Sequence, residues 1–245
     1  MGKQVWKPGN MLYPLPAVMV STADKKGNTN ILTVAWTGTV CTNPAMVYIS
    51  VRPERYSYQL IKDSKEFVIN LTTEELIRAT DYCGVRSGKD VDKWKECRLT
   101  EAKAVSLEYA PVIAESPVNI ECMVKNIQEL GSHHMFLAEV TAVQVDEKYM
   151  DEKGKFELNR TGLLAYSHGE YLGLGKKLGT FGYSVRKKPA LKEKERSRKK
   201  AGSAERIVRA GKTGCAGKAG GKGKTRSSGK AGKTRKPAAG RKAEK

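Results

Sequence analysis

Short apolar runs rich in β-branched residues, each ended by a turn signal, occupy the beginning of the chain. Residues 17–22 read AVMVST, and the polar cluster DKKGN at 24–28 ends this run. The run ILTVAWTGTV at 31–40 stops before Pro44, and MVYISV follows at 46–51. Runs of this length at hairpin spacing predict three strands of an antiparallel sheet.

The spacing becomes helical after Pro53 and later returns to strand. Proline suits the first turn of a helix, where its missing N–H costs nothing, and Tyr56, Leu60 and Ile61 follow at helical intervals. The remaining predictions are strands at 66–71, 118–127 and 135–145 and short helices at 73–83 and 90–96. About six strands with short helices between them, and neither βαβ alternation nor a GxGxxG motif, favour a closed or partly closed antiparallel barrel over a doubly wound sheet. The expected fold is therefore mainly β with peripheral helices.

The positive charge of the chain belongs almost entirely to one end. Residues 187–245 hold 22 Lys and Arg against four Glu, a net charge of +18, whereas residues 1–186 carry 23 basic and 22 acidic residues, a net charge of +1. Lys, Gly, Ala, Arg, Ser and Thr dominate the end segment, which cannot bury enough apolar surface to offset the entropy lost on ordering. The sequence thus predicts one folded domain over 1–186 and a disordered basic tail over 187–245.

The cysteine content and the hydropathy of the chain indicate the cellular compartment in which the protein is expected. The five cysteines are odd in number and widely spaced, so neither a disulfide framework nor a metal site is expected. Cys83 and Cys97 are expected to be buried thiols, with thiol–disulfide exchange as the lesser alternative. No apolar run approaches membrane-spanning length, and residues 1–16 lack a signal-peptide core. A cytoplasmic protein without a membrane contact is the resulting expectation.

The segment SVRPERYS at 50–57 brings two arginines and two hydroxyls to a strand-to-helix junction. Arginine meets phosphate oxygens with a planar pair of donors, and a helix N-terminus adds free N–H groups. A phosphate site is one interpretation. The other is that Arg52 and Arg55 are solvated or paired with Glu54, and the residues alone do not separate the two.

The run NILTVAWT at 30–37 carries small polar residues beside an aromatic one. A rim strand of this kind could hold a flat heterocycle through its backbone, with Trp36 against it. A core tryptophan on a barrel strand is the alternative that the pattern alone favours.

Eight segments, in order, resemble the flavin reductase or flavoredoxin family. They are YPLPAVMVSTAD, NTNILTVAWTGTVCTNP, YISVRPERYSYQLI, EFVINLTTEEL, DYCGVRSGKDVDKW, AESPVNIEC, ELGSHHMFLAEV and YSHGEYLGLGKKLGTFGYS. The resemblance extends from about residue 5 to residue 185 and stops at the tail. It implies a six-stranded antiparallel FMN-binding split β-barrel of Greek-key topology, and a homodimer that holds FMN at the subunit interface.

The resemblance also implies which residues contact the cofactor. The residues implied to contact the flavin ring are Thr33, Val34, Ala35 and Trp36. The residues implied to hold the ribityl phosphate are Ser50, Val51, Arg52 and Ser57. A further wall of the pocket is implied to consist of Asn70, Leu71 and Thr72. Lys93 matches a lysine that reaches the ring, where a cation would stabilise the reduced flavin.

His133 matches a histidine close to the nicotinamide site of NADH-dependent relatives and is the implied catalytic residue. His134 is adjacent, and neighbouring residues on a strand face opposite ways, so at most one of them should reach the flavin. An ordinary polar residue at the start of a strand is the alternative for each. The segment from His168 to Tyr171 resembles a family segment that packs near the site.

The expected function is that of an FMN-dependent oxidoreductase, a flavin reductase that takes hydride from NADH or NADPH and passes electrons to an acceptor that the sequence does not identify. Two alternatives stay open. One is a flavoredoxin-like FMN electron carrier without its own NAD(P)H site, and the other is a polyanion-binding protein acting through its tail. The charge of the tail predicts salt-dependent, sequence-independent binding to nucleic acid, unless the tail is only a solvated extension.

Overall fold

The computed structural model describes residues 1–186, and the predicted disordered tail at 187–245 lies outside the described residues. Contacts between residues divide the chain after Lys177, so Met1–Lys177 forms one unit and Leu178 begins another. In the second unit the described residues 178–186 contain one short 3-10 helix, η4 (Tyr183–Val185). The division into domains at 186 stays a prediction.

The first unit contains many short strands and few helices. Its strands are β1 (Leu15–Pro16), β2 (Val18–Ala23), β3 (Thr29–Val34), β4 (Thr37–Cys41), β5 (Met46–Val51), β6 (Glu66–Leu71), β7 (Glu101–Ala102), β8 (Val112–Ile113), β9 (Val118–Glu129), β10 (His134–Val145), β11 (Leu164–Ser167) and β12 (Glu170–Gly173). Its helices are α1 (Tyr56–Ser64), α2 (Ile77–Val85) and α3 (Lys93–Cys97), with 3-10 turns η1 (Glu74–Leu76), η2 (Glu147–Tyr149) and η3 (Leu158–Arg160). Among the described residues, no helix is long and apolar enough to span a membrane.

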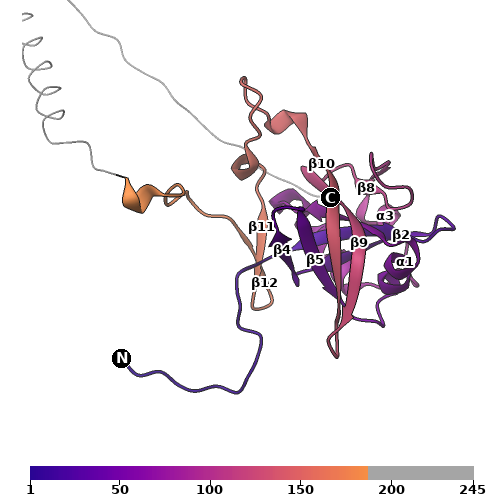
Figure 1. Cartoon of the computed structure of the whole chain (residues 1–245), viewed down its shortest axis with the longest axis horizontal. Coiled ribbons are helices and arrows are strands. Elements are labelled where there is room, and N and C mark those ends of the chain that lie inside the picture. Colours follow the sequence, from indigo (N-terminus) through magenta and orange to yellow (C-terminus); the bar gives the residue numbers. More distant parts are fainter. Residues whose placement is uncertain (187–245) are drawn as a thin grey trace, which may run out of the picture. The chain divides into compact units, whose positions relative to one another are not determined.

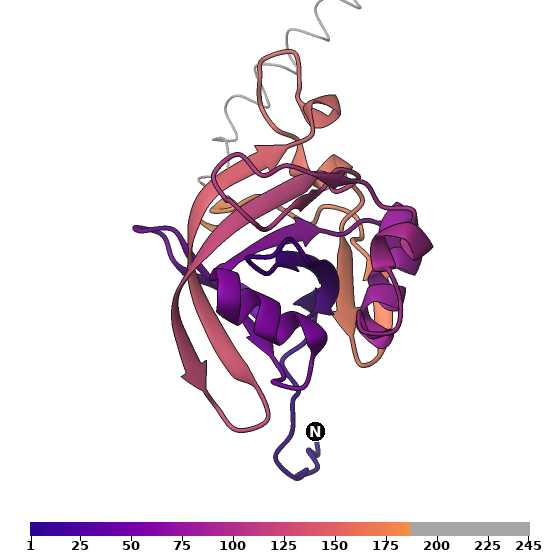
Figure 2. The same ribbon diagram turned by 90° about the vertical axis from the view of Figure 1, so that its right-hand side faces the viewer.

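A seven-stranded antiparallel sheet with the strand order β3-β2-β6-β9-β10-β5-β4 forms the body of this unit (Figure 1). Its two edge strands are β3 and β4, yet only Ala35 and Trp36 separate them along the chain. So short a connection brings the two edges together, and the sheet curls around its interior as Figure 2 shows. The mainly β, barrel-like fold is therefore confirmed, with seven strands in the main sheet where six were expected.

The prediction of one continuous strand at 31–40 is wrong, because the chain bends at Trp36. The backbone N–H of Thr37 donates to the carbonyl of Ala35 at 3.0 Å, and the N–H of Ser50 donates to the carbonyl of Trp36 at 2.9 Å. These bonds turn the chain and attach the bend to β5. The β-branched sequence favours strand on both sides and carries no local signal for the bend.

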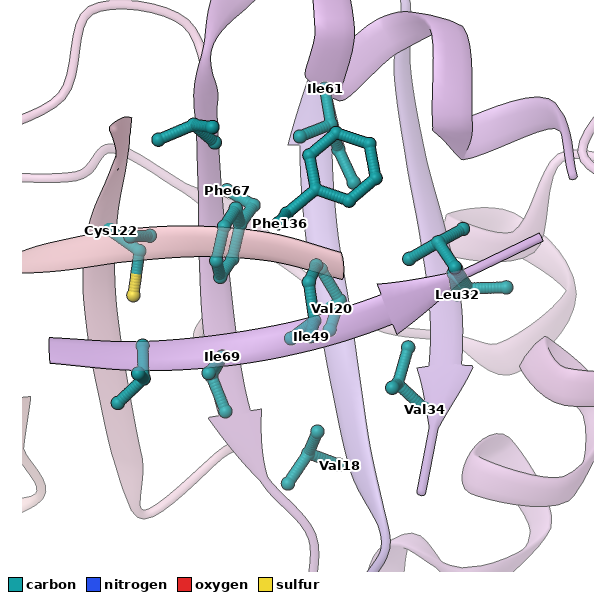
Figure 3. Close-up of a cluster of buried hydrophobic side chains, with 14 of the residues drawn as sticks. Val18, Val20, Leu32, Val34, Ile49, Ile61, Phe67, Ile69, Cys122 and Phe136 are labelled. Atoms are coloured by element: carbon teal, nitrogen blue, oxygen red, sulfur yellow. The ribbon is translucent and has the colours of Figure 1, made fainter. Parts of the chain in front are cut away.

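The interior of the curled sheet is a continuous apolar core (Figure 3). Alternate positions of the strands point inward, as period-2 geometry requires; among them are Val18, Val20, Leu32, Val34, Ile49, Val51, Phe67, Ile69, Cys122 and Phe136. Helix α1 adds Ile61 and Tyr58 to the same cluster. This one core fixes the register of the strands, since a slip by one residue would expose every inward side chain.

Strands β2 and β3 are buried on their outer face as well. Met19 and Ile31, which alternate with the inward positions, pack with Leu76, Ala79 and Cys83 of η1 and α2. Burial on both faces explains why β2 reads as an unbroken apolar and small-residue run rather than an alternating one. The outer layer fixes α2 against β3, which later becomes one wall of the site.

Two buried carboxylates hold the loop at 103–110 against the sheet. Glu66 and Glu121, both almost fully buried, accept hydrogen bonds chiefly from backbone N–H groups of this loop. The donors to Glu66 are the N–H groups of Glu108, Tyr109 and Ala110, and those to Glu121 are the N–H groups of Val105 and Ser106, the Ser106 hydroxyl and the Gln144 amide. A buried charge is tolerated only with such partners, so these residues fix the loop.

We predict that Glu121→Gln destabilises the fold in a pH-dependent way. Burial opposes ionisation of Glu121, but its hydrogen bonds to Ser106, Val105 and Gln144 outweigh burial and lower the carboxyl pKa below 4.5. A lowered pKa stabilises the folded state above the unfolded pKa and ceases to do so as the pH falls through the folded pKa. At pH 7 the amide, which cannot accept at both ends, should reduce the free energy of unfolding by about 2 kcal/mol.

Urea unfolding followed by circular dichroism measures this difference, which should narrow in acid. Glu139→Gln is the matched control, because Glu139 forms only a surface ion pair with Lys125, which is worth little. If the difference in free energy of unfolding between wild type and Glu121→Gln does not change with pH, the ionised form of Glu121 does not stabilise the fold.

Candidate functional site

A cleft opens at the end of the edge strand β3, beside the bend that joins it to β4; we call it the edge cleft. It has a volume of about 410 Å³, within the range of small-molecule sites. Its lining comes from the end of β3, the bend, the end of β5, α2 and the β11–β12 hairpin: Ala17, Leu32, Thr33, Val34, Ala35, Trp36, Ser50, Val51, Arg52, Arg55, Asp81, Gly84, Val85, His133, Tyr166, Gly169 and Tyr171. The four strand residues predicted for a flavin ring, and three of the four residues predicted for its phosphate, line this cleft, whereas Lys93, also predicted to reach the ring, does not.

Strand β3 presents an unpaired backbone edge to this region. Among the strands that the structure describes it pairs only with β2, and the carbonyl of Ile31 on its free side accepts a hydrogen bond from the Lys93 ammonium at 2.7 Å. By the alternation of backbone groups in an antiparallel strand, Thr33 has its N–H and C=O on the same free side. The Thr33 hydroxyl donates instead to the carbonyl of Thr80 in α2. The end of β3 can thus hydrogen-bond a flat polar heterocycle through its backbone.

Trp36 and His133 form one side of the edge cleft. Trp36 is 41% exposed at the bend, and its ring centroid lies 5.4 Å from that of His133. Burial, helped by the positive charge of Arg52, lowers the pKa of His133, so the imidazole is neutral at pH 7. The interpretation of Trp36 as a core residue does not hold.

The two adjacent histidines differ in their surroundings. His133 lines the edge cleft, whereas His134 shares a hydrogen bond of 2.9 Å with the Tyr58 hydroxyl and packs edge-on against that ring. The geometry leaves His133 as the one of the pair that can reach a ligand in the cleft, as strand alternation requires.

A further wall of the cleft consists of residues that the sequence motifs did not single out individually. Tyr166 and Tyr171 pack together from β11 and β12, with ring centroids 5.7 Å apart. The Tyr171 hydroxyl donates to Asp81 at 3.4 Å, and burial together with Asp81 raises the pKa of Tyr171 to about 12. Only the resemblance of the segment from His168 to Tyr171 signalled this wall, because its contacts depend on the tertiary fold.

A second cavity continues from the edge cleft and is strongly cationic; we call it the cationic cavity. It shares Leu32, Arg52 and Arg55 with the edge cleft. Its lining is Asn30, Leu32, Arg52, Glu54, Arg55, Tyr56, Ser57, Arg86, Ser87, Gly88 and Lys93. Four cationic side chains therefore face a single carboxylate.

The N-terminus of α1 opens into the cationic cavity without a cap of its own. Arg55 stands at the N-cap, no side chain caps the helix, and no acidic residue lies in its first turn. The first N–H groups, at Tyr56 and Ser57, are thus left for an external acceptor, and an anion suits this position. Arg55 is also fixed toward α2, since its Nη1 donates to the carbonyl of Gly84 at 3.1 Å.

Gly88 allows the loop after α2 to close over this cavity. A Cβ at residue 88 would lie 2.3 Å from Oδ1 of Asn30 and 2.7 Å from the Tyr56 ring. Asn30 in turn donates to the Ser57 hydroxyl at 2.8 Å. A glycine is needed here because any side chain would push the loop away from the start of α1.

Lys93 lies in the cationic cavity and not in the edge cleft. Lys93 is only 3% exposed, and its ammonium group donates to the carbonyls of Ile31 and Cys83, at 2.7 and 2.8 Å. Burial lowers its pKa to about 8. At neutral pH Lys93 therefore remains charged, and it ties α3 to both β3 and α2. A contact with a flavin ring stays a prediction.

Asn70, Leu71 and Thr72, which were predicted to line the pocket, line neither cavity. Asn70 is fully buried; its amide donates to the carbonyl of Met19 and its oxygen accepts from the backbone N–H of Ile113. Thr72 donates to the carbonyl of Ala17 at 2.6 Å. These contacts give the segment a role in joining β2 to β6, and a contact with a ligand stays a prediction.

The geometry agrees with the known proteins that the chain resembles. A family model described as flavin reductase like domain matches residues 11–175. The structure of the flavoredoxin of Desulfovibrio vulgaris (Miyazaki F) is 27% identical with a TM-score of 0.70, over 76% of this chain and 100% of that one. The flavoredoxin from Methanosarcina acetivorans is 26% identical with a TM-score of 0.68, again over 76% and 100%. An uncharacterized protein of Archaeoglobus fulgidus is 30% identical over 161 residues, 65% of this chain and 87% of its own length.

We predict that Arg52→Ala weakens binding of FMN, the cofactor that the sequence implies. Arg52 lines both cavities, and its only ion pair within residues 1–186 is with Glu54 at 3.3 Å on the surface. A charge-assisted bond to phosphate is worth roughly 1.5–3 kcal/mol, so the dissociation constant should rise about tenfold or more. Isothermal titration with FMN measures the change, and Arg160→Ala, an exposed arginine outside both cavities, is the control. Equal affinity in the two variants would refute the assigned phosphate site.

Proposed function

The chain belongs to the family of flavin reductase like domains, and from this premise we propose that it binds FMN across the edge cleft and the cationic cavity and acts as an NAD(P)H-dependent oxidoreductase. When bound, FMN supplies the hydride-accepting and electron-transferring chemistry, which needs no nucleophile from the protein. The chain's own residues bind the cofactor, orient it and leave room for a nicotinamide.

The observation that carries this proposal is the juxtaposition of an unpaired strand edge and a cationic helix start. The free backbone of β3 at Thr33 suits the polar edge of a flat heterocycle, and Arg52, Arg55 and the start of α1 suit a phosphate. The two sites share lining residues and are therefore reachable by one molecule. A ring joined to a phosphate by a flexible chain, as in FMN, matches this arrangement.

We propose that His133 contacts the nicotinamide substrate. It lines the edge cleft beside Trp36, and its lowered pKa keeps it neutral. A neutral imidazole offers one donor and one acceptor to a polar substrate, and it does not add another cation to the cleft. We therefore propose a positioning role at the nicotinamide.

The proposed active form is a cytoplasmic homodimer. Large apolar side chains are exposed on the N-terminal segment, where Val5, Trp6 and Leu12 are 100%, 73% and 84% exposed. Trp36 at the edge cleft is also part of the exposed apolar surface. Burial of such residues against a second copy would lower the free energy of both chains.

A visible spectrum before and after anaerobic addition of NADH or NADPH tests the function. We expect purified protein, or protein supplied with FMN, to show flavin absorbance that either nucleotide bleaches. Bleaching by dithionite but by neither nucleotide would instead identify the flavoredoxin-like electron carrier. Protein that takes up no FMN would refute both.

A second proposal concerns residues 187–245, whose net charge of +18 stands against +1 for the rest of the chain. Each phosphate that such a segment neutralises releases counterions, so binding to nucleic acid should be independent of sequence and weaken steeply with salt. No aromatic residue lies in this segment, which argues against stacking on single-stranded bases.

Truncation after Arg186 tests this second proposal. In a filter-binding assay with double-stranded DNA at low salt, the truncated chain should lose measurable affinity, while its FMN binding stays unchanged. Retention of DNA affinity without the tail would show that the folded part binds the nucleic acid.

A further inference from the structure

Two thiols face each other next to a backbone segment that lines the proposed flavin site. Cys83 of α2 and Cys97, the last residue of α3, have their Sγ atoms 3.9 Å apart. Cys83 is fully buried, and Cys97 is partly exposed. The proposed function uses neither side chain, and a pair of this kind is more than the lone buried thiol that fills space in many cores.

The pair needs only a small movement to become a disulfide, whose sulfurs are about 2.0 Å apart. Helix α3 is five residues long, and the residue that follows it, Arg98, is in the left-handed conformation. A helix of little more than one turn can shift more readily than a strand of the sheet. Cys97 is therefore the half of the pair that would move.

The surroundings of the pair both hinder and favour its reaction. Burial raises the pKa of Cys83 to about 12 and also raises that of Cys97. The positive charge of Lys93 acts on both thiols in the opposite direction, and Arg78 acts likewise on Cys97. Because the thiolate is the reactive form, we expect oxidation to start at the more accessible Cys97 and to be slow.

The backbone that carries Cys83 also forms the wall of the proposed cofactor site. The carbonyl of Cys83 accepts from Lys93, and the carbonyl of Gly84 accepts from Arg55. Gly84 also packs closely on Thr33, because a Cβ added there would lie 3.3 Å from that of Thr33. Movement of Cys83 or of α3 is thus transmitted to two cations of the cationic cavity and to the edge of β3.

We propose that Cys83 and Cys97 are a redox-sensitive pair that peroxide converts to a disulfide, and that the disulfide weakens flavin binding. The Cys97 sulfur attacks one oxygen of hydrogen peroxide, the O–O bond breaks, and a sulfenic acid and one water form. The Cys83 sulfur then attacks the Cys97 sulfur, the S–O bond breaks, and the S–S bond and a second water form. The two thiols lose two electrons, which reduce the peroxide, and a dithiol reverses the change.

The part of this inference that concerns flavin rests on the proposed function, so the test has two separate readouts. The test protein is the full-length chain with two substitutions, Cys41→Ser and Cys215→Ser. They remove the partly exposed thiol of Cys41 and the thiol that lies outside residues 1–186. After treatment with hydrogen peroxide, intact mass and peptide mapping should show a loss of two hydrogen atoms and a Cys83–Cys97 cross-link that dithiothreitol removes. Titration with FMN should then give a dissociation constant about tenfold higher for the oxidised than for the reduced protein, as expected when one charge-assisted contact is lost.

The matched control adds Cys97→Ala to the same protein. It should form no cross-link, and its FMN affinity should be the same before and after peroxide. Tryptophan fluorescence gives an independent signal, because Trp94 packs against the cluster that holds Cys83 and should respond to peroxide only when both thiols are present.

Each outcome decides one part. Absence of the cross-link after peroxide overturns the inference whatever the flavin result. A cross-link with unchanged FMN affinity overturns the coupling to the site. Failure of the reduced protein to bind FMN overturns the proposed function and the coupling together, while the mass readout still decides whether the pair is redox-sensitive.

Discussion

The two-residue connection between β3 and β4 is the constraint from which the rest of the structure follows. Because Ala35 and Trp36 join the two edge strands of a seven-stranded sheet, the sheet cannot stay open and must curl until its edges approach. The curl encloses the apolar core and leaves the free side of β3 without a strand partner. An unpaired strand edge is ordinarily a liability that proteins cover or pair. Here it faces a cleft, which makes a bound ligand the natural partner for its backbone groups.

The distribution of buried charge separates structural from functional positions. Glu66 and Glu121 are buried, but backbone N–H groups donate to both carboxylates and side chains also donate to Glu121, so they hold a loop and need nothing further. In the cationic cavity positive charge is in excess. Four cationic side chains, one carboxylate and the uncapped N-terminus of α1 line it. Arg52, Arg55 and Arg86 are exposed, so water solvates them in the absence of a ligand, but a bound anion would meet several charge-assisted donors at once. The excess therefore points to an anionic group as part of the functional state.

The sequence predicted the strands better than it predicted the site. Period-2 alternation and β-branched runs identified β2, β5, β6, β9 and β10, because those signals are local and the core repeats them on each strand. The bend at Trp36 escaped prediction since it depends on a hydrogen bond from Ser50, a residue of another strand. For the site, the resemblance selected Thr33, Arg52 and His133, which do meet at the cleft. The resemblance could not show that the Asn70 side chain is hydrogen-bonded inside the fold. Nor could it show that Tyr166 and Asp81 line the edge cleft, because both facts arise from contacts between segments far apart in the sequence.

The separation of charge between the two parts of the chain bears on how each would recognise an anion. Since residues 1–186 carry a net charge of only +1, the cationic cavity draws on Arg52, Arg55, Arg86 and Lys93 at short range and not on an overall positive field. Salt screens charges separated by more than about 8–10 Å but has much less effect on a partly buried contact. Binding of a phosphate inside the cavity should thus depend weakly on ionic strength. The nucleic-acid binding that we propose for residues 187–245 would have the opposite character, because an effect spread over 22 basic residues acts through released counterions and falls steeply with salt. The chain would then combine two kinds of anion recognition. The cationic cavity would select its ligand by shape, whereas residues 187–245 would bind through charge alone.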